Sequence, residues 1–323
     1  MAFESSGNRA SRNASPPHAW AGAEAPRREA ELHGPKAQPA PAGELPALFC
    51  VGPPRTATTW LHAVLRERLS LPRLKETYFF DKFHSRGLAW YLSHFERLDG
   101  RMRGEIAPSY FFSEDARQRI RAAAGRARIV VTLRDPVQRL YSLYKMRYSN
   151  GAFPWSFAEA CERDGELRTT AHCAPHLAAW QRCFGRDHVL TLLYEDLPRD
   201  PQSWLDQVCG FAGIPHCRLR AEQLAPVHSS TPALIPSHPR WTRLGVGVGN
   251  WIHNREWEGA IALVRRLRLR RFFLERGQRF PQLDPKVEQA LRRKLAADIE
   301  ALESLLGRDL TMWKPRAGHP GET

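Results

Sequence analysis

Two separated stretches of the chain carry residue types that bind phosphate groups. The first is residues 52–59 (GPPRTATT), between a short apolar run at residues 48–51 and a segment with helical periodicity. Small residues let backbone N–H groups approach an anion, while a helix N-terminus and the Arg55 side chain supply positive charge. The loop lacks the Gly-Lys-[Ser/Thr] ending of a Walker A sequence. The alternative interpretation is a strand-to-helix turn with an N-capping threonine.

The second stretch is residues 134–142 (RDPVQRLYS), which directly follow the apolar run at residues 127–133. An arginine at the carboxyl end of a parallel strand points into the crevice where such sheets bind ligands. Pro136 suits the first turn of a helix, and Ser142 then lies two helical turns beyond Arg134. An arginine and a serine hydroxyl together suit a second phosphate group. Alternatively, Arg139 is a surface residue of this helix and Ser142 is a small packing residue.

A third stretch, residues 74–81 (LKETYFFD), places Lys75 beside Glu76. A carboxylate near cations stays ionised and is able to accept a proton, while a lysine offsets negative charge on a group in transfer. The alternative is an exposed Lys–Glu pair ahead of a strand. His84 is a second candidate for the base.

Taken together, these stretches resemble the sulfotransferases that use 3′-phosphoadenosine 5′-phosphosulfate (PAPS). That family combines a Pro-[Lys/Arg]-x-x-Thr-Thr-Trp loop with an Arg-x-Pro-x-x-Arg-x-x-Ser stretch, and both patterns stand here at residues 54–60 and 134–142. Residues 74–81 resemble the Lys-Glu-x-His-Phe-Phe-Asp stretch of the heparan-sulfate type, with Tyr78 in place of the histidine. The resemblance covers roughly residues 48–313.

By this resemblance, PAPS is the sulfuryl donor, and its 5′-phosphosulfate is bound by Arg55 and the residues that follow it: Thr56, Ala57, Thr58 and Thr59. Trp60 stacks on the adenine, which Tyr194 also contacts, while Arg134 and Ser142 bind the 3′-phosphate. A late basic loop with Arg276, Gln278 and Arg279 closes over the cofactor.

The resemblance also implies the catalytic groups. Glu76 is the base, Lys75 contacts the transferring sulfuryl group, and Arg55 neutralises the leaving phosphate. Residues 104–111 resemble a family stretch that borders the acceptor, so Glu105, Ser109 and Tyr110 are candidate acceptor contacts.

Two positions depart from the family pattern. Arg55 stands where many members have lysine, and because arginine stays protonated it cannot donate a proton as an acid. Ala57 stands where glycine is common. The loop must therefore avoid a positive φ at this residue or accept backbone strain.

Apolar runs that alternate with helical periodicity predict the fold. The expected strands are residues 48–51, 127–133 and 188–194, and the main expected helices are residues 60–69, 114–124, 137–147, 177–184, 204–212 and 285–306. This alternation predicts an α/β fold, a P-loop-like parallel sheet with helices on both faces, in a single domain at residues 45–314. Residues 1–44 are expected to be disordered, and residues 315–323 to form a C-terminal tail.

Composition limits the partners and the location. The formal net charge of +14 favours anionic partners. The six cysteines form no CxxC pattern, and the group His172, Cys173, His176 and Cys183 fits no common zinc spacing, so free thiols and no metal are expected. Without an apolar stretch typical of a signal peptide or a membrane span, a cytoplasmic location is expected.

The expected function is sulfuryl transfer from PAPS to a hydroxyl or amine of a small molecule or glycan, in line and without a metal. No nucleic-acid partner is expected, and residues 228–241 are expected to be a variable acceptor loop. The alternatives are a P-loop kinase-like phosphotransferase and a non-catalytic protein that binds anionic glycans or nucleic acid. The basic stretch at residues 265–271 fits such binding or a solvated helix face.

Overall fold

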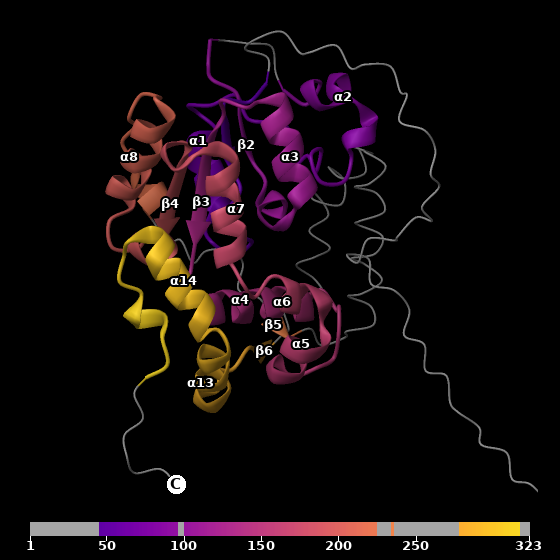
Figure 1. Ribbon diagram of the computed structural model, residues 1–323, viewed down its shortest axis with the longest axis vertical. Coiled ribbons are helices and arrows are strands. Elements are labelled where there is room, and N and C mark those ends of the chain that lie inside the picture. The colour runs from indigo at the N-terminus through magenta and orange to yellow at the C-terminus, as the bar shows by residue number, and fades with distance from the viewer. Residues whose placement is uncertain (1–44, 96–99, 225–233, 236–277, 317–323) are drawn as a thin grey trace, which may run out of the picture.

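The computed structural model describes residues 45–95, 100–224, 234–235 and 278–316 (Figure 1). The expectations for residues 1–44, for the basic stretch at residues 265–271 and for Arg276 lie outside these ranges, as does most of residues 228–241. The three stretches with candidate chemistry are all described.

Four parallel strands form the central sheet, in the order β2-β1-β3-β4. The strands β1 (Leu48–Cys50), β3 (Arg128–Leu133) and β4 (Val189–Leu193) confirm the three predicted ones. In the strand register, Leu48 of β1 is paired with Gly104 of β2 on one side and with Arg128 of β3 on the other. The fourth strand, β2 (Gly104–Ile106), is not predicted by the pattern, because Gly-Glu-Ile contains a single apolar side chain.

Helices cover both faces of this sheet (Figure 1). On one face, α1 (Thr58–Leu65) and α8 (Pro201–Ala212) share a buried cluster with Leu48, Cys50 and Val130. On the other, α3 (Glu114–Ala123) and α7 (Ala174–Phe184) pack with Phe49 and Ile129. Because alternate residues of β1 and β3 enter different clusters, both strands are buried on two sides. The predicted α/β architecture is confirmed.

The helix α4 (Pro136–Ser149) begins directly after β3. The Asp135 carboxylate caps it by accepting hydrogen bonds from two backbone N–H groups, and Pro136 occupies the first turn as expected. Figure 1 shows α4 with α5 (Phe157–Arg163) and α6 (Gly165–Thr169) below the arrowheads of the strands, at their carboxyl ends. Arg139 of α4 is fully buried and donates to the carbonyl of Thr170, so it is not a surface residue.

The long helix expected at residues 285–306 is two helices, α13 (Pro285–Lys294) and α14 (Ala296–Leu306). They meet at Leu295, where φ is −98° and ψ is 4°. The first contacts α4 and the second contacts α7. Because both helices bury one face, the apolar periodicity of the sequence continues across Leu295. The sequence pattern therefore does not reveal the break between the two helices.

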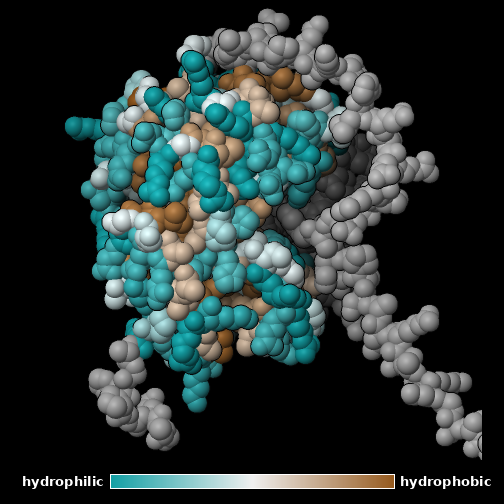
Figure 2. Space-filling view, viewed as in Figure 1, coloured by the Kyte–Doolittle hydropathy of each residue, from teal (hydrophilic) through white to brown (hydrophobic). Residues whose placement is uncertain are grey.

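Other short elements are α2 (Leu88–Leu92), α9 (Ala221–Leu224), several 3₁₀ helices and an antiparallel pair, β5 (Leu234–Ile235) with β6 (Gln278–Arg279). Within the described ranges, none of the helices combines the length and the apolar composition that a membrane span requires. All six cysteines are free, as expected. On the face shown in Figure 2, hydrophilic residues predominate and hydrophobic residues form separate small patches.

Candidate active site

The loop between β1 and α1 is strained at two positions. Arg55 has a φ of 76° and Ala57, the N-cap of α1, has a φ of 68° and a ψ of 16°. Alanine therefore accepts the left-handed conformation for which glycine is better suited. Tyr78, with a φ of 53°, is the remaining non-glycine residue with a positive φ among the described residues. Arg55 and Ala57 are predicted site residues, and Tyr78 lies two positions after the candidate base Glu76; stored strain commonly occurs at functional sites.

The loop is fixed to the neighbouring strand β3. The hydroxyl of Thr56 donates to the carbonyl of Pro53 at 2.7 Å and lies 2.6 Å from the hydroxyl of Thr132, which must then be the donor. A Cβ at Gly52 would lie 2.2 Å from the same Thr132 oxygen, so only glycine fits here. Thr56 as a whole is fully buried, whereas Thr59 is exposed.

The two predicted phosphate-binding stretches meet in space. The Arg55 Nε donates to Ser142 Oγ at 2.9 Å, and an Arg134 Nη lies 3.3 Å from the carbonyl oxygen of Arg55. The Arg134 guanidinium also stacks 4.3 Å from the centroid of the Tyr194 ring. Burial, and next the charge of Arg134, lower the pKa of Arg55. Two cations thus lie side by side, which suits a doubly anionic ligand.

The Lys75–Glu76 pair lies against the start of α1. The Lys75 Nζ lies 3.1 Å from Thr59 Oγ1 and 3.5 Å from Glu76 Oε1. The Glu76 side chain is 22% exposed, so it is accessible but partly desolvated. Burial, followed by the neighbouring Glu76 carboxylate, raises the pKa of the Tyr78 phenol. The candidate base and lysine are therefore next to the phosphate-binding loop, although they are 16 or more residues further along the chain.

Trp60 is half-buried at the other side of the loop. Its indole N–H donates to the carbonyl of Gln223 at 2.9 Å, and its ring packs edge-on against Trp204 with centroids 5.7 Å apart. These contacts fix the ring plane at the first turn of α1. A fixed indole next to a phosphate loop is suited to stack on a base.

Gln278 and Arg279 form the exposed strand β6, whose partner β5 is held to α4. The Ser149 hydroxyl donates to the carbonyl of Leu234 at 2.7 Å, and the Tyr141 hydroxyl donates to the carbonyl of Pro281 at 2.5 Å. The late basic stretch is thus attached to the helix that carries Ser142. Arg276 lies outside the described residues.

Two of the three expected acceptor contacts are buried. Glu105 and Tyr110 are 1% and 0% exposed, and Ser109 is half-buried, with its Oγ atom buried. The Glu105 carboxylate lies at the centre of a cluster of hydroxyl groups instead of facing solvent. Sequence alone does not predict this burial, because glutamate is almost never fully buried and tyrosine is intermediate between buried and exposed.

A buried network that sequence reasoning missed holds the turn that bears Arg134. The backbone N–H of Asp135 donates to Glu195 Oε1 at 2.8 Å, and Arg292 of α13 donates to Asp135 Oδ2 at 2.7 Å. Arg292 also donates to the carbonyl of Trp313. The sequence indicates part of this network, because Asp135 directly precedes a proline and is therefore a candidate N-cap. It does not indicate the ion pair, because Arg292 is 157 residues away in the chain.

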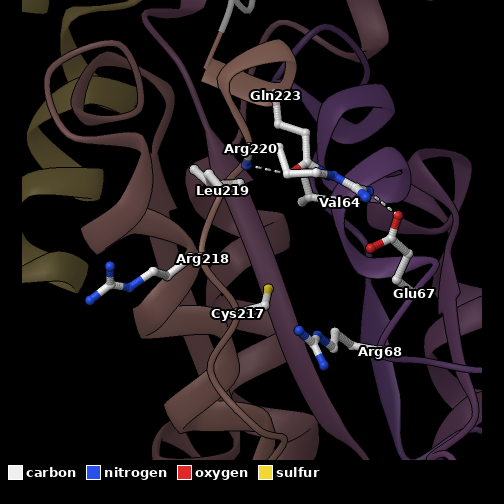
Figure 3. A pocket seen from close by; sticks show the side chains of 8 residues that line it. All are labelled: Val64, Glu67, Arg68, Cys217, Arg218, Leu219, Arg220 and Gln223. Atoms are coloured by element: carbon white, nitrogen blue, oxygen red, sulfur yellow. Dashed lines mark hydrogen bonds and ion pairs between the residues drawn. The ribbon is translucent and has the colours of Figure 1, made fainter.

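Among the described residues, no group of three or more His, Cys, Asp or Glu side chains could hold a metal ion. In the candidate zinc group, the Cys173 N–H binds Asp298 and His176 packs against Phe112. A surface pocket of about 230 Å³ lies between the end of α1 and residues 217–223 (Figure 3). Its lining includes Glu67, which pairs with Arg220, but no residue of the predicted site.

Fold and site together define a parallel α/β protein in which the loop after the first strand and the turn after β3 lie together and bring two arginines side by side. A sequence profile described as "Sulfotransferase family" matches residues 104–217. Within these residues, the chain is similar to the sulfotransferase family.

Individual relatives agree with this assignment. The chain is 33% identical over 180 residues to human heparan sulfate glucosamine 3-O-sulfotransferase 6, covering 52% of each chain. It is 28% identical over 206 residues to mouse bifunctional heparan sulfate N-deacetylase/N-sulfotransferase 4, covering 53% of this chain and 23% of the relative. The chain therefore spans about half or less of the length of these relatives.

A solved structure supports the fold. A sulfotransferase from Alicyclobacillus acidocaldarius superimposes with a TM-score of 0.60 at 21% identity, covering 83% of this chain and 98% of that one. At this identity, the likeness is evidence for the shared fold alone.

Proposed function

We propose that this protein transfers a sulfuryl group from PAPS to a glycan-type acceptor, by in-line displacement and without a metal. One observation carries the proposal. Arg55 of the first phosphate-binding stretch and Ser142 of the second are joined at 2.9 Å, although they are 87 residues apart in the chain. The two stretches that resemble the binding sites for the 5′ and 3′ ends of the donor therefore lie together and would bind one ligand.

The donor would be held mainly by the loop and by α4. Backbone N–H groups of Thr56, Ala57, Thr58 and Thr59 would bind the 5′-phosphosulfate at the N-terminus of α1. Arg134 and Ser142 would bind the 3′-phosphate, for which the present Arg55–Ser142 bond would open. Trp60 and Tyr194 would contact the adenine, and Gln278 and Arg279, with Arg276, would close over the cofactor.

Glu76 would accept the proton of the attacking acceptor group. It lies beside Lys75, whose Nζ already contacts Thr59 of the loop at 3.1 Å. Lys75 would stabilise charge on the transferring sulfuryl group, and Arg55 would neutralise the leaving phosphate. Because the transferring group of PAPS carries less charge than that of ATP, fixed cations are sufficient and no metal is needed.

The acceptor class rests on the relatives and on charge. Both named relatives act, by name, on heparan sulfate. The net charge of +14 suits a polyanionic chain of this kind. We therefore propose a glycan acceptor, with a hydroxyl or an amine as the attacking group. The cytoplasmic location expected from the sequence stays a prediction.

Transfer of radioactive sulfur from labelled PAPS to an acceptor tests the proposed function. The protein is incubated with ³⁵S-labelled PAPS and a panel of heparan sulfate, chondroitin sulfate, 4-nitrophenol and glucosamine, in the presence of EDTA. The expected result is label on a glycan acceptor. A parallel reaction with γ-³²P-labelled ATP and Mg²⁺ should transfer nothing.

Two results would contradict the proposal. Phosphate transfer from ATP that needs Mg²⁺, without sulfuryl transfer, would support the kinase alternative. Salt-sensitive binding of heparan sulfate without any turnover of PAPS would support a non-catalytic binding protein.

A further inference from the structure

The Glu105 carboxylate is buried, and its hydrogen-bond partners among the described residues include no cation. It is 1% exposed and lies in the centre of β2, paired in register with Phe49 of β1. Three hydroxyl groups surround it: Thr77 Oγ1 donates to Oε1 at 2.6 Å, the Tyr110 hydroxyl donates to Oε1 at 3.1 Å, and the Tyr91 hydroxyl donates to Oε2 at 2.7 Å. Burying a carboxylate is costly even when it is hydrogen-bonded, and an apolar residue would suit this strand better.

The hydroxyl cluster fixes the backbone that follows Glu76. The Thr77 backbone N–H also points to Glu105 Oε1, at 3.4 Å, and Thr77 Oγ1 accepts from the N–H of Phe79 at 3.2 Å. Between them, Tyr78 has the positive φ of 53°. A strained residue persists only where its surroundings determine its conformation. Glu105 and its partners supply that constraint from the central sheet.

We propose that Glu105 is a positioning residue, which holds Thr77 and thereby orients the Glu76 carboxylate toward the acceptor. This inference rests on the proposed function, in which Glu76 is the base. The path is short: Glu105 on a rigid strand binds Thr77, and Thr77 is covalently joined to Glu76. Small displacements of a catalytic group reduce the rate strongly, by as much as ~10²-fold for 1 Å.

The charge state of Glu105 gives the proposal a specific readout. Burial raises the pKa of Glu105 to about 7, against the opposing effect of the hydrogen bonds from Thr77, Tyr91 and Tyr110. Asp81 and Arg103 are the charged groups that act on this cluster, Asp81 through Tyr110 and Arg103 through Tyr91. The ionised carboxylate accepts from every hydroxyl, whereas the protonated form must itself donate one hydrogen bond. If Glu105 positions the base, we expect activity to fall as the pH drops through about 7.

The test compares Glu105→Gln with the wild type, using heparan sulfate as the probe acceptor and ³⁵S-labelled PAPS as donor. Glutamine keeps the shape but resembles the protonated acid. We expect kcat at pH 8 to fall by about 10- to 100-fold, with the Kd for 3′-phosphoadenosine 5′-phosphate (PAP) unchanged. The ratio of wild-type to variant kcat should approach one as the pH falls from 8 to 6. A ratio that stays constant over this range would overturn the proposal.

A second pair of variants separates positioning from folding. Thr77→Val keeps the shape but removes the donor, whereas Thr77→Ser keeps the donor. We expect Thr77→Val to lower kcat by about 10-fold and Thr77→Ser to retain it, both with wild-type affinity for PAP. Equal kcat values in the two variants would overturn the proposal.

Glu76→Gln is assayed beside these variants. Loss of turnover in Glu76→Gln together with wild-type kcat in Glu105→Gln overturns only the positioning role. Wild-type turnover in Glu76→Gln overturns the assignment of the base and, with it, this inference.

Discussion

Backbone strain at single residues is concentrated in the parts of the chain that would hold the donor and the base. Arg55 and Ala57 lie in the phosphate loop, and Tyr78 follows the candidate base by two positions. The sequence indicates that Ala57 must either avoid a positive φ or accept backbone strain, but it does not predict which of the two occurs. The outcome depends on how tightly Thr56 and Gly52 are held against Thr132, which is a tertiary contact.

Ala57→Gly should stabilise the protein. Alanine in the left-handed region is unfavourable by roughly 1–2 kcal/mol, part of which glycine loses again through its flexible unfolded state. We expect the free energy of unfolding to rise by about 0.5–1 kcal/mol, measured by urea denaturation. Ala63→Gly, in the exposed middle of α1, is the matched control and should lower it by about 1 kcal/mol. Equal losses in both variants would show that Ala57 is not strained.

Glu76→Gln should abolish most of the turnover. The amide keeps the shape of the side chain but cannot accept a proton, so kcat should fall by ~10²–10⁴. The affinity for PAP should remain near that of the wild type, because the donor site is formed by other residues. Glu67→Gln, which alters an exposed glutamate at the pocket near the end of α1, is the control and should leave kcat unchanged. A near-normal kcat in Glu76→Gln would direct the search to His84.

Residue types and spacing predict much of the candidate site at this scale. They identify Arg55, Lys75, Glu76, Arg134 and Ser142, which the structure brings together. They do not predict that Glu105 and Tyr110 turn inward. Glu105 lies in β2, whose three residues give too short a pattern to define a buried face, and Tyr110 lies in the short 3₁₀ helix Pro108–Phe112 that follows.

At the scale of elements, α13 stabilises the turn that presents Arg134. Arg292 on α13 is 8% exposed and binds Asp135, which is 9% exposed and caps α4. Glu195, at the end of β4, holds the N–H of the same aspartate. The helix α13, the residues just after β4 and the start of α4 are thus joined at the turn that bears Arg134. The apolar periodicity of the sequence predicts α4 and α13. It does not predict that Arg292 pairs with Asp135, because residues so far apart in the chain leave no local sequence pattern.

Arg292→Met should destabilise the protein, because it leaves the Asp135 carboxylate buried without its partner. Removing one member of a buried ion pair costs about 3–5 kcal/mol of unfolding free energy. Arg293→Met, at the exposed neighbouring position on α13, should change it by less than about 0.5 kcal/mol. Thermal unfolding and PAP titration of both variants would check this. Equal stability of the two variants would mean that the Arg292–Asp135 pair does not hold the turn.

At the scale of the whole molecule, the alternation of strands and helices predicts the layered architecture correctly. Buried runs such as residues 127–133 are unambiguous, since apolar residues on both faces of a strand indicate a covered parallel sheet. The order of the strands is not predictable in this way. β1 lies between β2 and β3, so the chain adds strands on both sides of the first, and only tertiary packing decides which side.

The candidate donor site joins segments from across the molecule, namely the loop after β1, the start of α4 and the residue after β4. A ligand that binds these segments in the native state alone must stabilise the whole fold, by about 2.7 kcal/mol at a concentration of 100 times Kd.

The most direct measurement is therefore the melting temperature of the wild type and of Arg134→Ala, with PAP or with AMP, in EDTA. We predict a clearly larger increase with PAP than with AMP for the wild type. In Arg134→Ala this difference should disappear, because AMP lacks the 3′-phosphate that Arg134 would bind. Equal stabilisation of the wild type by PAP and AMP would contradict a PAPS site at these residues.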